Sequence, residues 1–447
     1  MRRRQPICCA SPTVRVIAAW FALLLVAQLL FPCAGYGYAV LAHQALIDTV
    51  WESHLKPLLK ARYPNATEEE LSAAQAYSYG GSIIQDCGYY PHGSHFFSDL
   101  THYVRSGDFV MAMLRDSGDI YDYAFALGAL SHYATDNEGH RMATNRAVPL
   151  LYPSLKKKFG DFVTYEDDEL AHVKTEFGFD VQQVALQRYA PSSYHDFIGF
   201  EVSQPLLDRA FQETYGIELK SVMHDEELAL NSYRRDVSNL IPKATRIAWA
   251  LKEKEIQADE PSVTKRKFLY NLSRAEYEKE WGKNYERPSR RERFDAFLFK
   301  LLPKFGPLRV LELKTPTPET ERMFEESFNL AVSDYRRLLK EESEGKLQLP
   351  NVNFDVGKET EGGKYRLNDN AHAQLLHALA RKRFECLSPD LRQELLSFFS
   401  SAEAPYAFKK DPKTWDRVQA ELQALKATGA EAAQAPEPSA RVKPSAE

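Results

Sequence analysis

The chain has 447 residues, of which 44% are hydrophobic, and a formal net charge of −5. This length is enough for two or three domains, and the hydrophobic content excludes a chain that is disordered throughout. The negative charge argues against a nucleic-acid-binding protein, because such proteins usually carry a basic surface.

The first 37 residues have the pattern of a targeting segment. An apolar run over residues 16–31, interrupted only by Gln28, follows Arg15. The run is short for a membrane-spanning helix, and small residues follow it from Ala34 to Gly37. We therefore expect residues 1–37 to be a signal peptide, cleaved between Ala34 and Gly37, and the protein to be exported, either secreted or periplasmic. The alternative is a leader that stays uncleaved as a membrane anchor. Cleavage would remove four arginines and change the formal charge to −9.

The cysteines do not form a disulfide framework. Three of the five, Cys8, Cys9 and Cys33, lie in the leader. The remaining two, Cys87 and Cys386, are far apart in sequence, and the pattern leaves open whether they pair.

The chain after the leader is predicted to be all-α. An apolar helix over residues 38–51 carries His43 near its start, and Thr67 followed by Glu70 has the spacing of a capping box. Residues 80–97 are rich in glycine and aromatic residues, which predicts a loop that presents Asp86. A further element is expected to open around Thr101 and His102.

The most informative stretch follows an apolar helical run over residues 121–130. His132, Asp136 and His140 recur at i, i+4 and i+8, so a continuing helix would project all three from one face. Imidazole nitrogens and carboxylate oxygens are both zinc ligands, and a carboxylate can bridge two ions. The alternative is three buried helix residues that only form hydrogen bonds.

A second pair with the same spacing lies on the helix predicted over residues 166–183. His172 and Glu176 are i, i+4 neighbours and could hold a second ion. Ten of the twelve histidines lie before residue 225, a crowding that scattered core histidines would not produce. His95 and Asp99 form a further i, i+4 pair, read either as support for the metal ligands or as surface residues.

For the rest of the chain the sequence predicts helices, a linker and loops, and we assign no site residues there. Charged helical patterns cover residues 201–257, a proline-bearing linker is predicted at 258–265, and amphipathic helices continue over 266–426. Residues 351–364 read as a loop within this C-terminal helical region, whose role the sequence leaves open. Residues 427–447, rich in Ala, Pro, Glu and Ser, are predicted to be a disordered tail.

The segment over residues 38–257 resembles the zinc-dependent phospholipases C, a superfamily that also contains the fungal single-strand nucleases. The resemblance rests on four stretches in the same order. They are Ala42-His43-Gln44-Ala45-Leu46, Asp86-Cys87 followed by Thr101-His102-Tyr103, Leu130-Ser131-His132-Tyr133-Ala134-Thr135-Asp136, and Ala171-His172-Val173-Lys174-Thr175-Glu176-Phe177.

The resemblance implies a site for two or three zinc ions. A first ion would be held by Asp86, His102, His132 and Asp136. A second would be held by His140, His172 and Glu176. A third would share Asp136 and use His43, with the amine and carbonyl of the mature N-terminus completing its shell.

Two positions depart from the family's pattern. The secreted bacterial members place the second-site histidine six residues after the bridging aspartate, where this chain has Met142. His140 comes only four residues after Asp136, a spacing similar to that of glycosylphosphatidylinositol-specific phospholipase D. The usual N-terminal Trp is absent as well, and Tyr38 could be the N-terminal ligand only if cleavage follows Gly37.

The resemblance implies a phospholipase C-like phosphodiesterase that hydrolyses phospholipids with zinc-activated water, with Asp86 as general base or purely as a ligand. Aromatic side chains in the 80–97 loop would either line a lipid-facing mouth at a membrane surface or pack in the core. The alternatives are a single-strand nuclease and a non-catalytic zinc-bearing envelope protein. Nucleic acid is the less expected substrate for an acidic chain, and no protein partner is assigned to the C-terminal region.

Overall fold

The computed structural model describes residues 40–186, 188, 200–237, 241–258, 288–301, 306–400 and 405–434, and within these ranges the fold is all-α, as expected. Their only β pairing is an isolated bridge between Asn353 and Lys358. The leader, Tyr38, residues 259–265 of the expected linker and residues 266–287 of the helical region expected after it lie outside the described residues.

The first part of the described chain holds nine helices and three short turns of other helix types. The helices are α2 (Val40–Val50), α3 (Lys56–Arg62), α4 (Glu68–Gly81), α5 (His95–Tyr103), α6 (Ser106–Asp116), α7 (Ile120–Gly139), α8 (Asn145–Leu151), α9 (Pro153–Phe159) and α10 (Glu169–Ala185). The turns are the π-helical η1 (Trp51–Leu55) and η3 (His140–Thr144) and the 3-10 helix η2 (Ile84–Tyr89).

The second part of the described chain holds eight further helices. They are α12 (Gln204–Tyr215), α13 (Glu226–Arg235), α14 (Ile241–Ala258), α16 (Arg290–Leu301), α17 (Pro318–Ser343), α18 (Arg366–Arg381), α19 (Pro389–Phe398) and α20 (Pro412–Gln434), with 3-10 turns η4 (Leu219–Ser221), η6 (Gly306–Leu311) and η7 (Tyr406–Phe408). Helix α20 includes the first residues of the segment expected to be disordered from residue 427.

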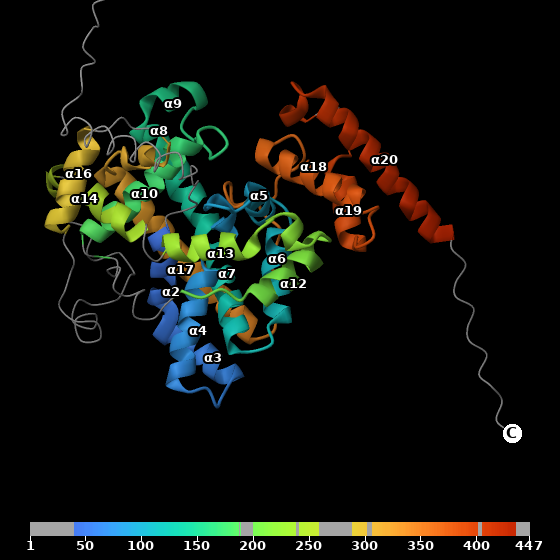
Figure 1. Cartoon of the computed structure of the whole chain (residues 1–447), viewed down its shortest axis with the longest axis horizontal. Helices are drawn as coiled ribbons and strands as arrows, with labels where there is room; N and C mark the ends of the chain where they lie inside the picture. Colours follow the sequence, from blue (N-terminus) through green and yellow to red (C-terminus); the bar gives the residue numbers. More distant parts are fainter. Residues whose placement is uncertain are drawn as a thin grey trace, which may run out of the picture.

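Helix α7 lies in the middle of the fold (Figure 1). Asp119 caps its N-terminus by accepting hydrogen bonds from the backbone N–H groups of Tyr121 and Asp122. Nearly all of its side chains from Tyr123 to Asp136 are buried, and it packs most extensively against α4 and α17. A helix that is buried on all sides holds its side chains rigidly, which suits it to carry a site.

Two glycines allow α4 and α7 to approach closely. A Cβ atom on Gly81 would lie 1.9 Å from the carbonyl oxygen of Phe125, and one on Gly128 would lie 2.2 Å from that of Ser78. Both neighbours are backbone atoms that cannot move aside, so the crossing requires glycine at both positions.

The C-terminal helices are packed onto the same core. Phe324 and Phe328 on α17 are fully buried, and the hydroxyl of Tyr335 donates to the carbonyl oxygen of Leu127 on α7 at 2.8 Å. Helix α18 packs on α5, and one continuous apolar cluster extends from α2 to Leu425 on α20. The domain boundaries stay a prediction, but residues from both sides of the expected linker share this core.

The capping box at α4 is confirmed, with Thr67 and Glu70 exchanging the two expected hydrogen bonds. The expected loop over residues 80–97 is more ordered than predicted, because η2 and the start of α5 lie within it. Cys87 is buried, Cys386 is exposed, and both are free. Among the described residues, no helix is long and apolar enough to span a membrane.

Candidate metal centre

The structure brings all eight predicted metal ligands into one buried region. Each has at most 4% of its surface exposed. They come from α2 (His43), η2 (Asp86), α5 (His102), α7 (His132 and Asp136), the start of η3 (His140) and α10 (His172 and Glu176). Five separate segments of chain therefore converge on the end of α7.

The first cluster contains Asp86, His102 and His132, whose ligand atoms lie within 4.8 Å of one another. The Nε2 atom of His102 is 3.1 Å from Oδ1 of Asp86 and 3.5 Å from Oδ2 of Asp136. The Nε2 atom of His132 is 3.1 Å from the same Asp136 oxygen. The first predicted ligand set thus meets around one point.

A second cluster lies on the other oxygen of Asp136 and contains His43, His132 and Asp136. The Nε2 atom of His43 is 3.3 Å from Oδ1 of Asp136, and its ring stacks on His132 with centroids 4.5 Å apart. Asp136 therefore faces the first cluster through Oδ2 and His43 through Oδ1, which is the arrangement a bridging carboxylate needs.

The third cluster contains His140, His172 and Glu176. Oε1 of Glu176 is 2.8 Å from Nε2 of His172 and 3.3 Å from Nε2 of His140. The Nε2 atom of His140 also lies 3.9 Å from Oδ1 of Asp136, so this cluster adjoins the other two. His140 occupies the first position of a π-helical turn, a wider turn that often occurs at functional sites.

Backbone carbonyls orient two of the imidazole rings. The Nδ1 atom of His102 is 2.8 Å from the carbonyl oxygen of Ser98, and that of His132 is 3.0 Å from the carbonyl oxygen of Ser82. Each carbonyl selects the tautomer with the proton on Nδ1, which leaves Nε2 with a free lone pair toward the cluster. Metal-bound histidines usually have this outer partner.

The electrostatics of the region favour a positive charge at its centre. Burial lowers the pKa of His102, but the carboxylates of Asp136 and Asp86 outweigh it and raise the pKa to about 9. Burial raises the pKa of Asp136, but His132, His140 and His102 hold it well below its usual range. Protons on the imidazoles can supply the positive charge, and so can metal ions, which bind the same atoms in competition with protons.

The donor set fits zinc. Both carboxylate oxygens of Asp86, Asp136 and Glu176 are buried and receive no hydrogen bond of acceptable geometry. Unpaired buried carboxylates are costly, whereas neutral imidazole and carboxylate together are common zinc ligands. Burial, donor chemistry and mutual distances therefore all agree with a metal centre built from these residues.

The sequence also left open the roles of His95 and of the aromatic residues in the segment 80–97. His95 is exposed and belongs to none of the three clusters found in the described part of the chain. Of the aromatic residues in the segment 80–97, Tyr90 and Phe97 pack in the core, while the ring of Tyr89 lies 5.8 Å from that of His102. Core packing is thus the observed arrangement for Tyr90 and Phe97.

Sequence reasoning missed one carboxylate in this region, Asp355. It lies in the loop before α18, is 1% exposed, and has Oδ1 3.4 Å from Nδ1 of His140. No local spacing could have indicated it, because it is separated from His140 by more than two hundred residues of sequence and sits in an irregular loop.

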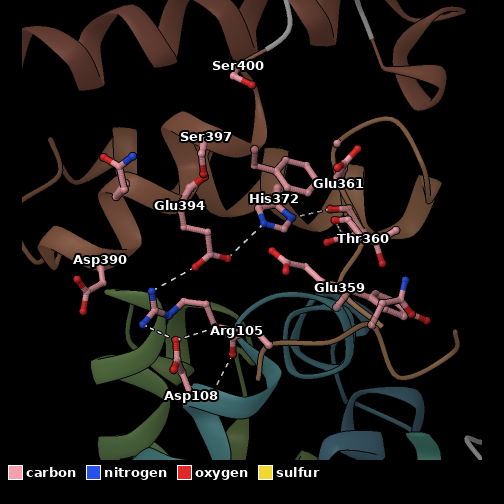
Figure 2. Close-up of a pocket in the computed structure, with 17 residues that line it drawn as sticks. Arg105, Asp108, Glu359, Thr360, Glu361, His372, Asp390, Glu394, Ser397 and Ser400 are labelled. Carbon is pink, nitrogen blue, oxygen red and sulfur yellow. Dashed lines mark hydrogen bonds and ion pairs between the residues drawn. The ribbon is translucent and has the colours of Figure 1, made fainter. Parts of the chain in front are cut away.

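A cleft of about 900 Å³ lies elsewhere, between the start of α6 and helices α18 and α19 (Figure 2). Arg105 pairs there with Asp108 at 2.6 Å and with Glu394 at 3.2 Å, and His372 is 3.5 Å from Glu394. Glu359, Glu361 and Asp390 also line the cleft, so carboxylates outnumber its arginine, and none of the eight predicted metal ligands does. Its negative charge disfavours a phosphodiester, so the buried clusters are the better candidate site for such a substrate.

Residues 41–225 match the model of the family described as zinc dependent phospholipase C. This range includes all eight predicted metal ligands and ends before α13. No curated protein and no solved structure matches the chain significantly.

Proposed function

We propose, from the premise that residues 41–225 belong to the zinc-dependent phospholipase C family, that the protein is an exported zinc-dependent phosphodiesterase that hydrolyses phospholipids. The observation that carries this proposal is the set of three adjoining buried clusters, with Asp136 shared between them. Such a set can hold neighbouring zinc ions, and neighbouring ions suit the displacement at phosphorus in a phosphodiester.

Bound zinc would supply Lewis acidity, which lowers the pKa of water and offsets negative charge that develops on the phosphoryl oxygens. The residues of this chain have the complementary tasks. His102 and His132 hold their Nε2 atoms in fixed directions. Asp136 directs one carboxylate oxygen toward His132 and the other toward His43. Burial of the whole set excludes bulk water and strengthens each of these interactions.

Asp86 is our candidate for the general base. It is fully buried on η2, and its Oδ1 atom is 3.1 Å from His102. If one oxygen serves as a ligand, the other can accept a proton from the attacking water. An Asp86→Asn variant that keeps its zinc and loses at least 100-fold in kcat would support this role, whereas a proportional loss of zinc would make Asp86 a ligand alone.

We propose two or three zinc ions. Asp86, His102, His132 and Asp136 would hold the first, and His140, His172 and Glu176 the second. A third would use His43 and Asp136, and Tyr38 could complete it through its amine if the leader is cleaved after Gly37. Export by that leader, or anchoring if it stays uncleaved, is part of the proposal, as is contact with a membrane surface that presents the lipid.

The test is an assay of the purified, zinc-loaded protein on phosphatidylcholine, phosphatidylinositol and single-stranded DNA, with Asp136→Ala in parallel. Release of diacylglycerol and a phosphorylated headgroup, lost in the variant, supports the proposal. Cleavage of DNA alone would make the protein a nuclease. Bound zinc without turnover of any substrate would favour a non-catalytic zinc-bearing envelope protein whose C-terminal region binds a partner.

A further inference from the structure

The loop between α17 and α18 contacts the metal centre although it lies outside the range that matches the family. Its backbone is fixed to the helices that carry the ligands. The hydroxyl of Tyr133 donates to the carbonyl oxygen of Pro350 at 3.0 Å, and the backbone N–H of Phe354 donates to that of His102 at 3.1 Å. The hydroxyl of Ser106 also donates to the carbonyl oxygen of Val352 at 2.6 Å.

Phe354 covers one side of the first cluster. It is fully buried, and its ring centroid lies 5.4 Å from that of His102 and 5.9 Å from that of His132. It also packs edge-on against Tyr133, at 5.4 Å. The loop therefore supplies part of the apolar wall around the imidazoles.

The next residue, Asp355, is held from several directions. Its Oδ2 atom accepts hydrogen bonds from the backbone N–H of Tyr165 at 3.0 Å and from the hydroxyl of Tyr365 at 2.7 Å. Its carbonyl oxygen accepts from Nδ2 of Asn145 at 2.7 Å, and its N–H donates to Oδ1 of Asn353 at 3.0 Å. With one oxygen and the backbone fixed in this way, Oδ1 is left to face Nδ1 of His140 at 3.4 Å.

Three of the histidines, His102, His132 and His140, each have an acceptor oxygen beside the Nδ1 atom. Carbonyl oxygens of Ser82 and Ser98 lie at the Nδ1 atoms of His132 and His102, and the carboxylate of Asp355 lies at that of His140. In each case the outer acceptor stands opposite the Nε2 atom that points to the cluster. A carboxylate in this place fixes the ring and makes Nε2 a stronger ligand than a carbonyl does.

We propose that Asp355 is a positioning residue for the second metal site: it accepts the Nδ1–H of His140 and so directs Nε2 toward the ion that His172 and Glu176 hold. This rests on the metal centre of the proposed function. It gives the C-terminal region a role in the centre, because the loop contributes an outer partner that the matched range lacks. It also offers a way for a histidine only four residues after Asp136 to be held in place at the start of a π-helical turn.

The test measures zinc binding without substrate. Full-length wild type, Asp355→Ala and the milder Asp355→Asn are stripped of metal and titrated with zinc against a chromophoric chelator, and cobalt-loaded samples are compared by visible absorption. We expect Asp355→Ala to weaken one zinc site by about 10- to 100-fold and to change the cobalt spectrum of that site. Asp355→Asn should lose less, because its amide oxygen can still accept from His140.

Two controls separate positioning from general stability. Glu359→Gln removes an exposed carboxylate from the same loop and leaves Asp355 and its hydrogen bonds in place, so zinc affinity should stay within about threefold of wild type. Thermal unfolding of the metal-free proteins reports the structural effect of each change. If both Asp355 variants bind zinc at every site with wild-type affinity, the inference is wrong, even if Asp355→Ala unfolds at a lower temperature.

The outcomes also separate this inference from the proposed function. A wild-type protein that binds zinc without hydrolysing any phosphodiester removes the proposed activity and leaves the Asp355 result valid. A wild-type enzyme that is active, with Asp355 variants unchanged in zinc affinity and in cobalt spectrum, removes the inference alone.

Discussion

The Nε2 atoms of His102 and His132 lie 3.4 Å apart, each on a ring whose Nδ1 atom is already paired with a backbone carbonyl. Two lone pairs that face each other at this distance need a cation between or beside them. A shared proton can be that cation, but the carboxylates of Asp86 and Asp136 lie against the same two nitrogens. A single proton would leave part of their negative charge uncompensated. This relationship underlies the assignment of a metal centre.

Replacement of Asp136 tests the shared carboxylate. Asp136→Asn keeps the size of the side chain but removes the charge that faces His43, His102 and His132. We expect the zinc content to fall by at least about one ion per chain and phospholipid hydrolysis to fall by about 100-fold or more. The measurements are metal analysis and initial rates.

The matched control is Glu138→Gln on the same helix. Glu138 is ion-paired with Arg141 at 2.6 Å and belongs to none of the clusters. It should keep full zinc and activity. Equal zinc contents in Asp136→Asn and Glu138→Gln would contradict the bridging role.

Truncation of Phe354 tests the contribution of the C-terminal loop to stability. This side chain is fully buried against His102, His132 and Tyr133, so Phe354→Ala leaves a cavity and should lower the free energy of unfolding by about 3–5 kcal/mol. Urea unfolding monitored by circular dichroism gives the value. The comparison is Phe294→Ala on α16, where 58% of the side chain is exposed and the effect should stay within about 0.5 kcal/mol.

Because α4 and α7 cross closely at Gly128, we expect alanine to be less favourable than glycine at this position, the reverse of their ordinary order in a helix. Alanine normally favours a helix over glycine by about 1 kcal/mol, but here its Cβ atom would lie 2.2 Å from the carbonyl oxygen of Ser78. We expect Gly128→Ala to destabilise the protein by about 1–3 kcal/mol. At Gly118 the nearest atom would be 3.6 Å away, so Gly118→Ala should be nearly neutral, and a thermal shift assay would compare the two. A higher melting temperature for Gly128→Ala would refute the tight crossing.

Asp208 on α12 and Glu226 on α13 predict a pH dependence of stability. Burial and the neighbouring carboxylate of Asp208 raise the pKa of Glu226 to about 7 from its ordinary 4.5. The folded state therefore holds a proton that the unfolded state releases. This contribution to stability is complete below about pH 4.5 and is lost as the pH rises through 7.

Glu226→Gln should remove that dependence. Relative to wild type, the variant should gain roughly 1 kcal/mol between pH 5 and pH 8, after allowance for solvent screening of a half-buried pair. Urea unfolding at the two pH values measures the difference. Glu227→Gln, at the exposed neighbouring position, is the control, and an identical pH response in both variants would rule out the Asp208–Glu226 coupling.

Local periodicity predicted the part of the site that lies on helices. The i, i+4 spacing of His132 with Asp136 and of His172 with Glu176 survives in α7 and α10, because consecutive helical turns fix these side chains on one face. The capping box at Thr67 was predicted for the same reason, since it depends on neighbours three residues apart.

Contacts between distant segments could not be predicted in this way. Composition indicated a loop before His102, but η2 and α5 form there because tertiary packing outweighs the local turn signals. The sequence correctly predicts a loop over residues 351–364, yet nothing local shows that Phe354 and Asp355 lie against His102 and His140. Their positions depend on the packing of α17 and α18 against α7 and α5.

The most direct test of the metal centre is the zinc content of the purified full-length protein, measured by elemental analysis after gel filtration in metal-free buffer. On the proposed function we expect about two or three zinc ions per chain. We also expect a fall in melting temperature when a strong chelator removes them, reversed by added zinc. A native protein that contains no zinc, takes up none when it is offered and melts at the same temperature with or without chelator would contradict the assignment of the three clusters as a zinc centre.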